Sequence, residues 1–180
     1  IKPNNDAFVS FDYNGAEIRT FLDLCEIPQP ATDIHAWNME NIFADQSLTR
    51  DEAKTLFFAW LYNPESQEIQ NDNYDREKLL DKHYKKGYIN TPYGRKIGVD
   101  RRKALNYLIQ STTSDRILAK AVLLDKMLDK RKSFISHVVH DEIVIDYSDE
   151  DRNMKTVFEG GYLSNVKLGK NYYQLNTLEL

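Results

Sequence analysis

The stretch VVHDEIVIDY, residues 138–147, places two adjacent acidic residues inside an otherwise apolar strand pattern. The Val, Ile and Tyr residues around Asp141 and Glu142 favour burial, whereas neighbouring carboxylates that are partly removed from water repel each other and cost free energy. A nearby cation has to offset that cost. The pattern also predicts a β-hairpin of FISHVV and EIVIDY, with its tight turn at His140 and Asp141.

A second strand is predicted over AFVSFDY (7–13), which alternates between apolar and polar residues and ends near Asp12. If this strand neighbours the hairpin, Asp12 and Asp141 converge at one end of a sheet. Carboxylate oxygens favour a hard cation such as Mg²⁺ over Zn²⁺. Two such ions about 3.5–4 Å apart activate a hydroxyl and neutralise a leaving phosphate. The alternative is that these acids are ordinary turn residues.

The rest of the chain mixes helices and strands without βαβ regularity, which favours an α+β fold. Asp33 is suited to cap a helix, and Thr49 with Glu52 has the spacing of a capping box. A weak point at STTS (111–114) leaves open whether the last long helix is broken. The predicted helices cover 14–25, 33–43, 49–62, 74–87, 100–130 and a short segment near 149–158, with a strand pair over 88–98 and a final strand or loop.

Composition suits one globular domain or part of a larger protein, with 180 residues of which 41% are hydrophobic and 29% charged. A single cysteine, Cys25, excludes a disulfide framework and a multi-cysteine zinc site. The apolar runs are too short to span a bilayer. The chain begins with Ile1, so we expect it to be processed or cut from something longer.

The charge is unevenly distributed, although the net charge is −4. Residues 73–103 contain ten Lys and Arg against four Asp and Glu, and the other residues contain 14 basic against 24 acidic groups. Such asymmetry predicts one surface for a polyanion, and the alternative is a solvated basic helix.

Two helical stripes carry further chemistry. Arg50, Lys54, Phe58 and Tyr62 lie four residues apart, so two cations and two aromatic rings share one face. This order suits a triphosphate followed by a flat base, although an aromatic stripe is more often part of a core. Arg102, Asn106 and Gln110 repeat the spacing on the later helix. Minor-groove edges and sugar oxygens, or simply solvent, would satisfy that stripe.

These features together resemble the polymerase region of family A DNA polymerases. The likeness covers essentially the whole chain, in order, and keeps the internal spacing of four motifs. It rests on FDYNGAEIR (11–19, motif A), DIH (33–35), RDEAKTLFFAWLY (50–62, the O helix), TPYGRKI (91–97), RRKALNYLIQSTTSD (101–115), VVHDEIVIDY (138–147, motif C) and LGKNYYQL (168–175).

The resemblance implies a polymerase palm, in which an antiparallel sheet of the motif A strand and the motif C hairpin is backed by helices, with a shortened helical fingers subdomain. The implied segments are palm over 1–35, reduced fingers over 36–90 and palm over 91–180. There are departures from the family. Asn14-Gly15 replaces Ser-Gln, Asn63 replaces a Gly, and the segment between Tyr62 and Thr91 is short, as in phage polymerases.

The resemblance also implies roles for individual residues. Asp12 and Asp141 would be catalytic and would hold two Mg²⁺ ions with the backbone carbonyl of Tyr13, and Mn²⁺ would substitute. Glu17 would lie against C2′ of the incoming sugar. The implied dNTP-binding set is Glu17, His35, Arg50, Lys54, Phe58 and Tyr62, and the implied DNA-binding set is Arg102, Asn106, Gln110, His140 and Glu142. For His140 and Glu142 the alternative is simple support of the turn.

The implied function is template-directed DNA synthesis from dNTPs on a primer–template, in a bacterial or phage-infected cytoplasm and without a membrane partner. An upstream thumb or exonuclease region, or a separate subunit, would complete it. A second hypothesis is a palm that grips primer–template but is inactive without a thumb-bearing partner. A metal-dependent phosphohydrolase built on His140 and Asp141 is disfavoured, because its type needs further His ligands on helices and the chain has only four His residues.

Overall fold

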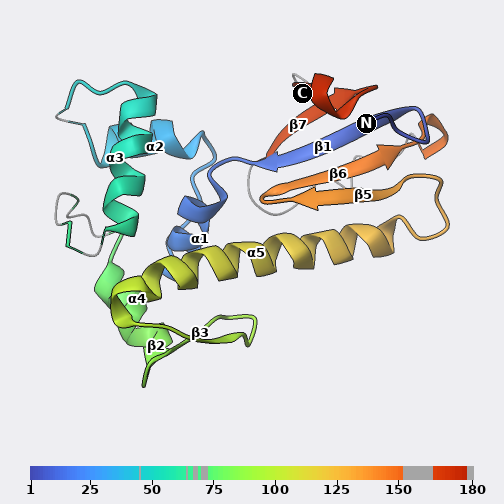
Figure 1. The fold of residues 1–180 in the computed structure, drawn as a ribbon. Coiled ribbons are helices and arrows are strands. Elements are labelled where there is room, and N and C mark those ends of the chain that lie inside the picture. Colours follow the sequence, from blue (N-terminus) through green and yellow to red (C-terminus); the bar gives the residue numbers. More distant parts are fainter. Residues whose placement is uncertain (45, 64, 67–68, 70–72, 152–163, 178–180) are drawn as a thin grey trace. The chain divides into compact units, whose positions relative to one another are not determined.

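Strand β1, Ala7–Tyr13, lies inside an antiparallel sheet and is paired along both of its edges (Figure 1). Among the residues that the structure describes, the sheet has five strands in the order β5-β6-β1-β7-β8. The predicted strand over 7–13 and the predicted hairpin are both confirmed. The other strands are β5 Phe134–Val139, β6 Glu142–Tyr147, β7 Ser164–Gly169 and β8 Asn176–Thr177.

The structure is a computed structural model, and the chain divides into two compact units. The sheet unit comprises Ile1–Asn14 with Ser114–Leu180, and the helical unit comprises Gly15–Thr113. No helix in the described part of the chain is long and apolar enough to cross a membrane. The described residues are 1–44, 46–63, 65–66, 69, 73–151 and 164–177.

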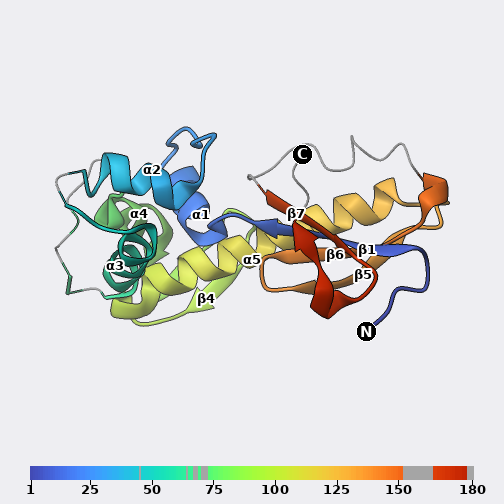
Figure 2. The same ribbon diagram turned by 90° about the horizontal axis from the view of Figure 1, so that it is seen from above.

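One face of the sheet is apolar, and the opposite face combines polar residues with the buried Phe8 and Val144. Val9 pairs with Ile145 and Phe11 with Ile143, and all four side chains are buried. Figures 1 and 2 show the C-terminal half of helix α5 running along the sheet, and its residues Ile117, Ala121 and Leu124 are buried. Because side chains alternate along a strand, Ser10 and Asp12 belong to the opposite face.

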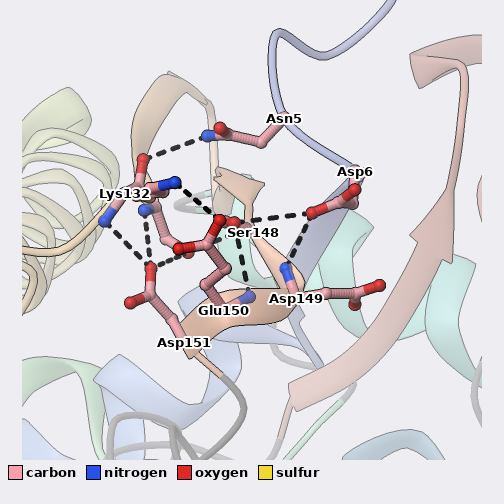
Figure 3. A network of polar contacts seen from close by, with 8 residues as sticks. Asn5, Asp6, Lys132, Ser148, Asp149, Glu150 and Asp151 are labelled. Carbon is pink, nitrogen blue, oxygen red and sulfur yellow. Dashed lines mark hydrogen bonds and ion pairs between the residues drawn. The ribbon is translucent and has the colours of Figure 1, made fainter.

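The register of the sheet is held at the end away from the hairpin turn by a network of polar contacts (Figure 3). Asp151 accepts hydrogen bonds from the backbone N–H of Lys132 (3.1 Å) and from the backbone N–H and hydroxyl of Ser133 (both 2.8 Å). Asp6 accepts one from the backbone N–H of Asp149 (2.8 Å). These bonds tie the starts of β1 and β5 to the end of β6.

The helical unit is built around an aromatic core of Phe21, Phe57, Trp60 and Tyr74, in which the rings of Phe57 and Tyr74 lie 4.7 Å apart. Its helices begin where the sequence predicts. The Asp33 carboxylate caps α2, and Thr49 with Glu52 forms a complete capping box for α3. The elements are α1 Ala16–Leu24, α2 Ile34–Asn41, α3 Arg50–Tyr62, α4 Arg76–His83, β2 Tyr84–Lys85, β3 Tyr88–Asn90, β4 Lys96–Gly98 and α5 Arg101–Met127, which continues into the sheet unit.

The α+β class is confirmed. Two helix predictions need correction, and for the helix predicted over 100–130 the structure decides between the long and the broken alternative. The helix predicted over 74–87 ends at His83, because Lys86 and Gly87 have positive φ and turn the chain into the β2–β3 hairpin. Helix α5 is unbroken through 111–114, where the Thr113 hydroxyl donates to that of Thr20 (2.9 Å). Near 149–158 the structure has a short 3₁₀ turn, Asp149–Asp151, and the rest of that prediction lies outside the described residues.

Gly15 explains one departure from the family motif. It caps α1 with φ of 60°, and a Cβ at this position would lie 2.3 Å from Cγ2 of Ile34. The larger residue that the family has here would need Ile34 to move. Gly94 has a similar φ of +80°, but a Cβ there would meet nothing within 4 Å.

We therefore expect Gly15→Ala to destabilise the protein more than Gly94→Ala. Both changes incur the left-handed backbone cost of about 1–2 kcal/mol, and only Gly15→Ala adds the clash with Ile34. The measurement is the free energy of unfolding of both variants and of Gly15→Ala/Ile34→Ala. Equal losses in the two single variants would contradict the close packing at Gly15.

Candidate active site

Asp12 on β1 and Asp141 in the turn before β6 lie at the same end of the sheet. In the β1–β6 register Asp12 faces Glu142, the residue that follows Asp141, and the backbone N–H of Tyr13 donates to the carbonyl of Asp141 (3.2 Å). The convergence that the sequence predicts for the two aspartates is therefore present within the sheet unit.

The turn between β5 and β6 consists of His140 and Asp141, as predicted. His140 is exposed and has φ of 53°, and Asp141 is half-buried. Burial raises the pKa of Asp141, and the negative charges of Asp12 and Glu142 raise it further, against the opposing effects of its backbone hydrogen bond and His140. The surroundings of Asp141 thus disfavour its ionised form unless a cation is present.

Glu142 is already hydrogen-bonded at both carboxylate oxygens. Oε1 accepts a bond from the Ser10 hydroxyl and Oε2 accepts one from the Tyr172 hydroxyl (2.9 Å). The Tyr172 ring packs edge-on against His137, with ring centroids 4.9 Å apart. Glu142 therefore supports the polar face of the sheet, while its contact with DNA stays a prediction.

Lys167 on β7 is a cation at this site that the sequence analysis missed. Its Nζ lies 2.7 Å from Oδ2 of Asp12, and Lys167 pairs with Ser10 across the β1–β7 ladder. The hydrogen bond to Asp12 raises the pKa of Lys167, and the charges of Asp12, Glu142 and Asp141 add to this effect against partial burial. The available signal was the alternation of SNVKLG, which places Lys167 on the face of Asp12 only once the β1–β7 pairing is known.

The donor atoms fit a hard divalent cation. They are carboxylate oxygens, which are the ligands that such a cation prefers. The three negative charges of Asp12, Asp141 and Glu142 exceed the one positive charge of Lys167, which interacts with all three. Within the described ranges no group of three or more His, Cys, Asp or Glu residues is arranged to hold a metal. Both carboxylate oxygens of Glu142 accept hydrogen bonds from hydroxyl groups, and Oδ2 of Asp12 accepts one from the Lys167 ammonium.

In the helical unit, Tyr62 links two other predicted site residues, Glu17 and Gln110. Its hydroxyl donates to a carboxylate oxygen of Glu17 on α1, and it also hydrogen-bonds with Gln110 on α5. Burial raises the pKa of Tyr62, and Glu17 raises it further, so the phenol stays protonated and remains a donor. Glu17, Tyr62 and Gln110 are thus brought together from separate helices.

An aromatic group continues along α3. The ring of Phe58 stacks on that of Tyr62 with centroids 5.9 Å apart and an angle of 18°, and His35 lies 6.2 Å from Phe58. Phe58 and Tyr62 are half-buried, whereas the neighbouring Phe57 is fully buried. The core of α3 therefore uses Phe57, and the predicted stripe keeps two ring surfaces partly accessible.

Arg50 is engaged at the start of the same helix. Its Nε and Nη2 donate to the two carboxylate oxygens of Asp33 (3.1 and 2.8 Å), which also caps α2. Lys54, one turn later, is exposed. An anionic ligand at this position would compete with Asp33 for Arg50, while Lys54 presents its ammonium to solvent.

The polar stripe on α5 is only partly exposed. Arg102 pairs with Glu65 (2.7 Å), and the buried Oδ1 of Asn106 accepts no hydrogen bond from the described residues. Tyr62, Arg102 and Asn106 line a common pocket with Arg76 and Arg101. The three α5 residues thus share an environment with the aromatic end of α3.

Of the predicted basic surface, Arg76 makes contacts within the fold, whereas the residues around the small sheet are exposed to solvent. Arg76 donates to the carbonyls of Trp60 (2.9 Å) and Asn63 (2.8 Å), so it holds the end of α3 rather than facing a ligand. The small β2–β3–β4 sheet carries exposed cations, including Lys96, whose ammonium lies 4.4 Å from the ring centroid of Tyr88. The exposed basic residues around this sheet are Lys85, Lys86, Arg95 and Lys96.

Comparison with known structures identifies the fold as that of a DNA polymerase domain. The chain superposes on the POL domain of Pol1 from M. smegmatis, solved in complex with DNA primer-template and dNTP, with a TM-score of 0.69 and 18% sequence identity. The match covers 92% of this chain and 40% of that chain.

A phage protein is similar in sequence. The chain is 26% identical to the DNA polymerase of Mycobacterium phage D29 over 80% of its own length. It spans 29% of the length of that relative. No protein-family model matches the chain. The resemblance to a phage-type polymerase is thus supported by one likeness in sequence and one in fold.

The buried His35 predicts a pH dependence of stability. Burial, followed by the charge of Arg50, lowers the pKa of His35 from 6.5 to about 4. The unfolded chain therefore binds a proton that the folded chain does not, so the free energy of unfolding should fall as pH is lowered from 6.5 to about 4. His35→Gln should make this part of the stability–pH curve flatter. Chemical denaturation at several pH values tests this, and above pH 7 the two curves should run parallel; equal slopes below pH 6.5 would contradict it.

Proposed function

We propose that this chain performs template-directed DNA synthesis, transferring a nucleotide from a dNTP to a primer 3′-hydroxyl, as the palm and fingers part of a family A DNA polymerase. The observation that supports the proposal is the β1–β6 pairing, which sets Asp12 opposite Glu142, the residue after Asp141, in a fold shared with a polymerase domain. The likeness to the phage D29 DNA polymerase supports it independently.

The sheet unit supplies the metal-binding residues in this proposal. Asp12 and Asp141 hold Mg²⁺ with the backbone carbonyl of Tyr13, in a two-ion arrangement that Mn²⁺ can also occupy. When bound, such ions activate the attacking hydroxyl and neutralise the leaving pyrophosphate. Glu142 does not bind metal; with its two hydroxyl donors it keeps the turn in place, and His140 at the exposed turn contacts the primer backbone.

The helical unit supplies the nucleotide-binding residues. Lys54 and Arg50 bind the triphosphate, with Arg50 exchanging its Asp33 partner for phosphate oxygens, and neutral His35 donates a hydrogen bond to a phosphate oxygen. Phe58 and Tyr62 stack on the nucleotide and template. Arg102, Asn106 and Gln110 follow the duplex. Oδ1 of Asn106, which accepts no hydrogen bond from the described residues, suits a donor on a minor-groove edge.

The segment assignment remains part of the proposal, with palm at 1–35 and 91–180 and reduced fingers at 36–90. Further contacts to the primer–template would come from a thumb region or subunit, since both proteins matched here extend well beyond the matched region. The same observation favours the second candidate, a primer–template-binding palm that is inactive by itself. Primer extension by this chain alone, compared with the chain plus its partner, separates the two.

Replacing either aspartate tests the metal assignment. Asp12→Asn and Asp141→Asn should each lower primer extension by roughly a thousandfold or more, a barrier increase of about 4 kcal/mol. Primer–template affinity should stay within a few-fold, because basic residues provide the grip on the duplex. Asp129→Asn, an exposed carboxylate at the end of α5, is the matched control. Near-normal extension by either variant would remove that residue from the metal site.

Glu17 is proposed to reject ribonucleotides. Its carboxylate is fixed by the Tyr62 hydroxyl, and a site closed around C2′ must clash with a 2′-hydroxyl or bury it without a partner. Glu17→Ala should therefore raise ribonucleotide incorporation relative to dNTP by about tenfold or more, with a smaller loss of dNTP activity than in Asp12→Asn. The ratio of the two efficiencies is measured against exposed Glu40→Ala. An unchanged ratio would leave Glu17 only as the acceptor of the Tyr62 hydrogen bond.

A further inference from the structure

Lys167 makes a partly buried ion pair with a proposed metal ligand. Its Nζ lies 2.7 Å from Oδ2 of Asp12, and the two side chains are 28% and 33% exposed. Lys167 is held from its own strand, because β7 pairs with β1 in a register that sets Lys167 opposite Ser10 and beside Asp12. The ammonium is thus positioned by the sheet, not by a flexible surface loop.

The position of this ammonium matters because of the charges around it. Lys167 interacts electrostatically with Asp12, Asp141 and Glu142. Glu142 has two neutral hydroxyl donors, Ser10 and Tyr172. Asp12, by contrast, accepts a hydrogen bond from the charged ammonium of Lys167. The ammonium therefore neutralises the Asp12 carboxylate directly. A divalent cation bound to Asp12 would lie close to this ammonium.

We propose that Lys167 is an internal counter-cation that competes with the divalent metal for Asp12. In the metal-free protein it neutralises Asp12 and keeps the carboxylates together. When a metal binds Asp12, the ammonium either gives up its hydrogen bond to Oδ2 or stays in place and repels the metal ion. Both outcomes lower the affinity for the metal. Lys167 is thus a positioning residue, and this inference rests on the proposed role of Asp12 as a metal ligand.

The two possible roles of Lys167, competition with the metal and structural support alone, predict different effects of removing its side chain. Removing a purely structural lysine lowers stability and disorders the site, so metal affinity falls as well. Removing a competing cation lowers the stability of the metal-free protein, because the carboxylates then repel each other, yet raises metal affinity. The two quantities therefore change in opposite directions only if Lys167 competes with the metal.

The experiment is a Mn²⁺ titration followed by electron paramagnetic resonance, with thermal unfolding measured without and with Mn²⁺, on the full 180-residue chain. Lys167→Met should bind Mn²⁺ about tenfold more tightly than wild type, equivalent to 1.4 kcal/mol, and should have a lower Tm without metal and a larger Tm gain on adding it. Lys167→Arg, which keeps the charge, should stay within about threefold of wild type in affinity. Lys170→Met, an exposed lysine just after β7, should match wild type in every measurement.

Unchanged or weaker Mn²⁺ binding by Lys167→Met would overturn the inference. An Asp12→Asn arm separates that result from failure of the proposed function. If Asp12→Asn loses Mn²⁺ binding while Lys167→Met leaves it unchanged, Asp12 is a metal ligand and only the competition is wrong. If Asp12→Asn and wild type bind Mn²⁺ equally, or if wild type binds none, both the metal site and the role of Lys167 are wrong.

Discussion

Strand β1 is hydrogen-bonded along both edges, and the arrangement of the charged residues depends on this double pairing. Its pairing with β6 sets Asp12 opposite Glu142, and its pairing with β7 brings Lys167 to the same face. A slip of one residue would turn Asp12 to the apolar face, where burial of its charge would be costly. The contacts of Asp6 and Asp151 at the far end of the sheet oppose such a slip. Backbone register, more than any single contact, thus creates the carboxylate site.

The three acids near the hairpin turn, Asp12, Asp141 and Glu142, are stabilised in different ways, and the differences separate their roles. Glu142 accepts hydrogen bonds from two hydroxyl groups, so its charge is solvated by the protein. Asp12 is paired with an ammonium. Asp141 is left with partial burial and like charges, which raise its pKa. A divalent cation would relieve Asp12 and Asp141 most, because Glu142 already has its donors.

In the helical unit, Asp33 and Arg76 each make two kinds of contact. Asp33 caps α2 and also binds Arg50, so the position of α2 is linked to the cation at the start of α3. At the other end of α3, Arg76 donates to carbonyls that the helix leaves unpaired and lies 4.6 Å over the ring of Trp60. This contact stabilises the C-terminal end of α3.

The local features of this protein follow from its sequence. Alternation predicts β1 and the hairpin, and capping residues predict where α2 and α3 begin, because each of these signals lies within a few neighbouring residues. The convergence of Asp12 and Asp141 was predicted only on the condition that their strands are neighbours, or from the family resemblance. Lys167, Ser10 and Tyr172 were not predicted, since their importance arises from pairing between β1 and β7 and from chain segments up to 155 residues apart in sequence. Helix α4 ends early because Lys86 and Gly87 have positive φ and turn the chain into the β2–β3 hairpin, in which the buried Ile89 pairs with Tyr84. Local residue patterns thus determined which elements form. Only the tertiary structure decided which strands pair, and which cation and which hydroxyl groups stabilise the acids that the pairing brings together, because electrostatic partners are chosen by proximity in space.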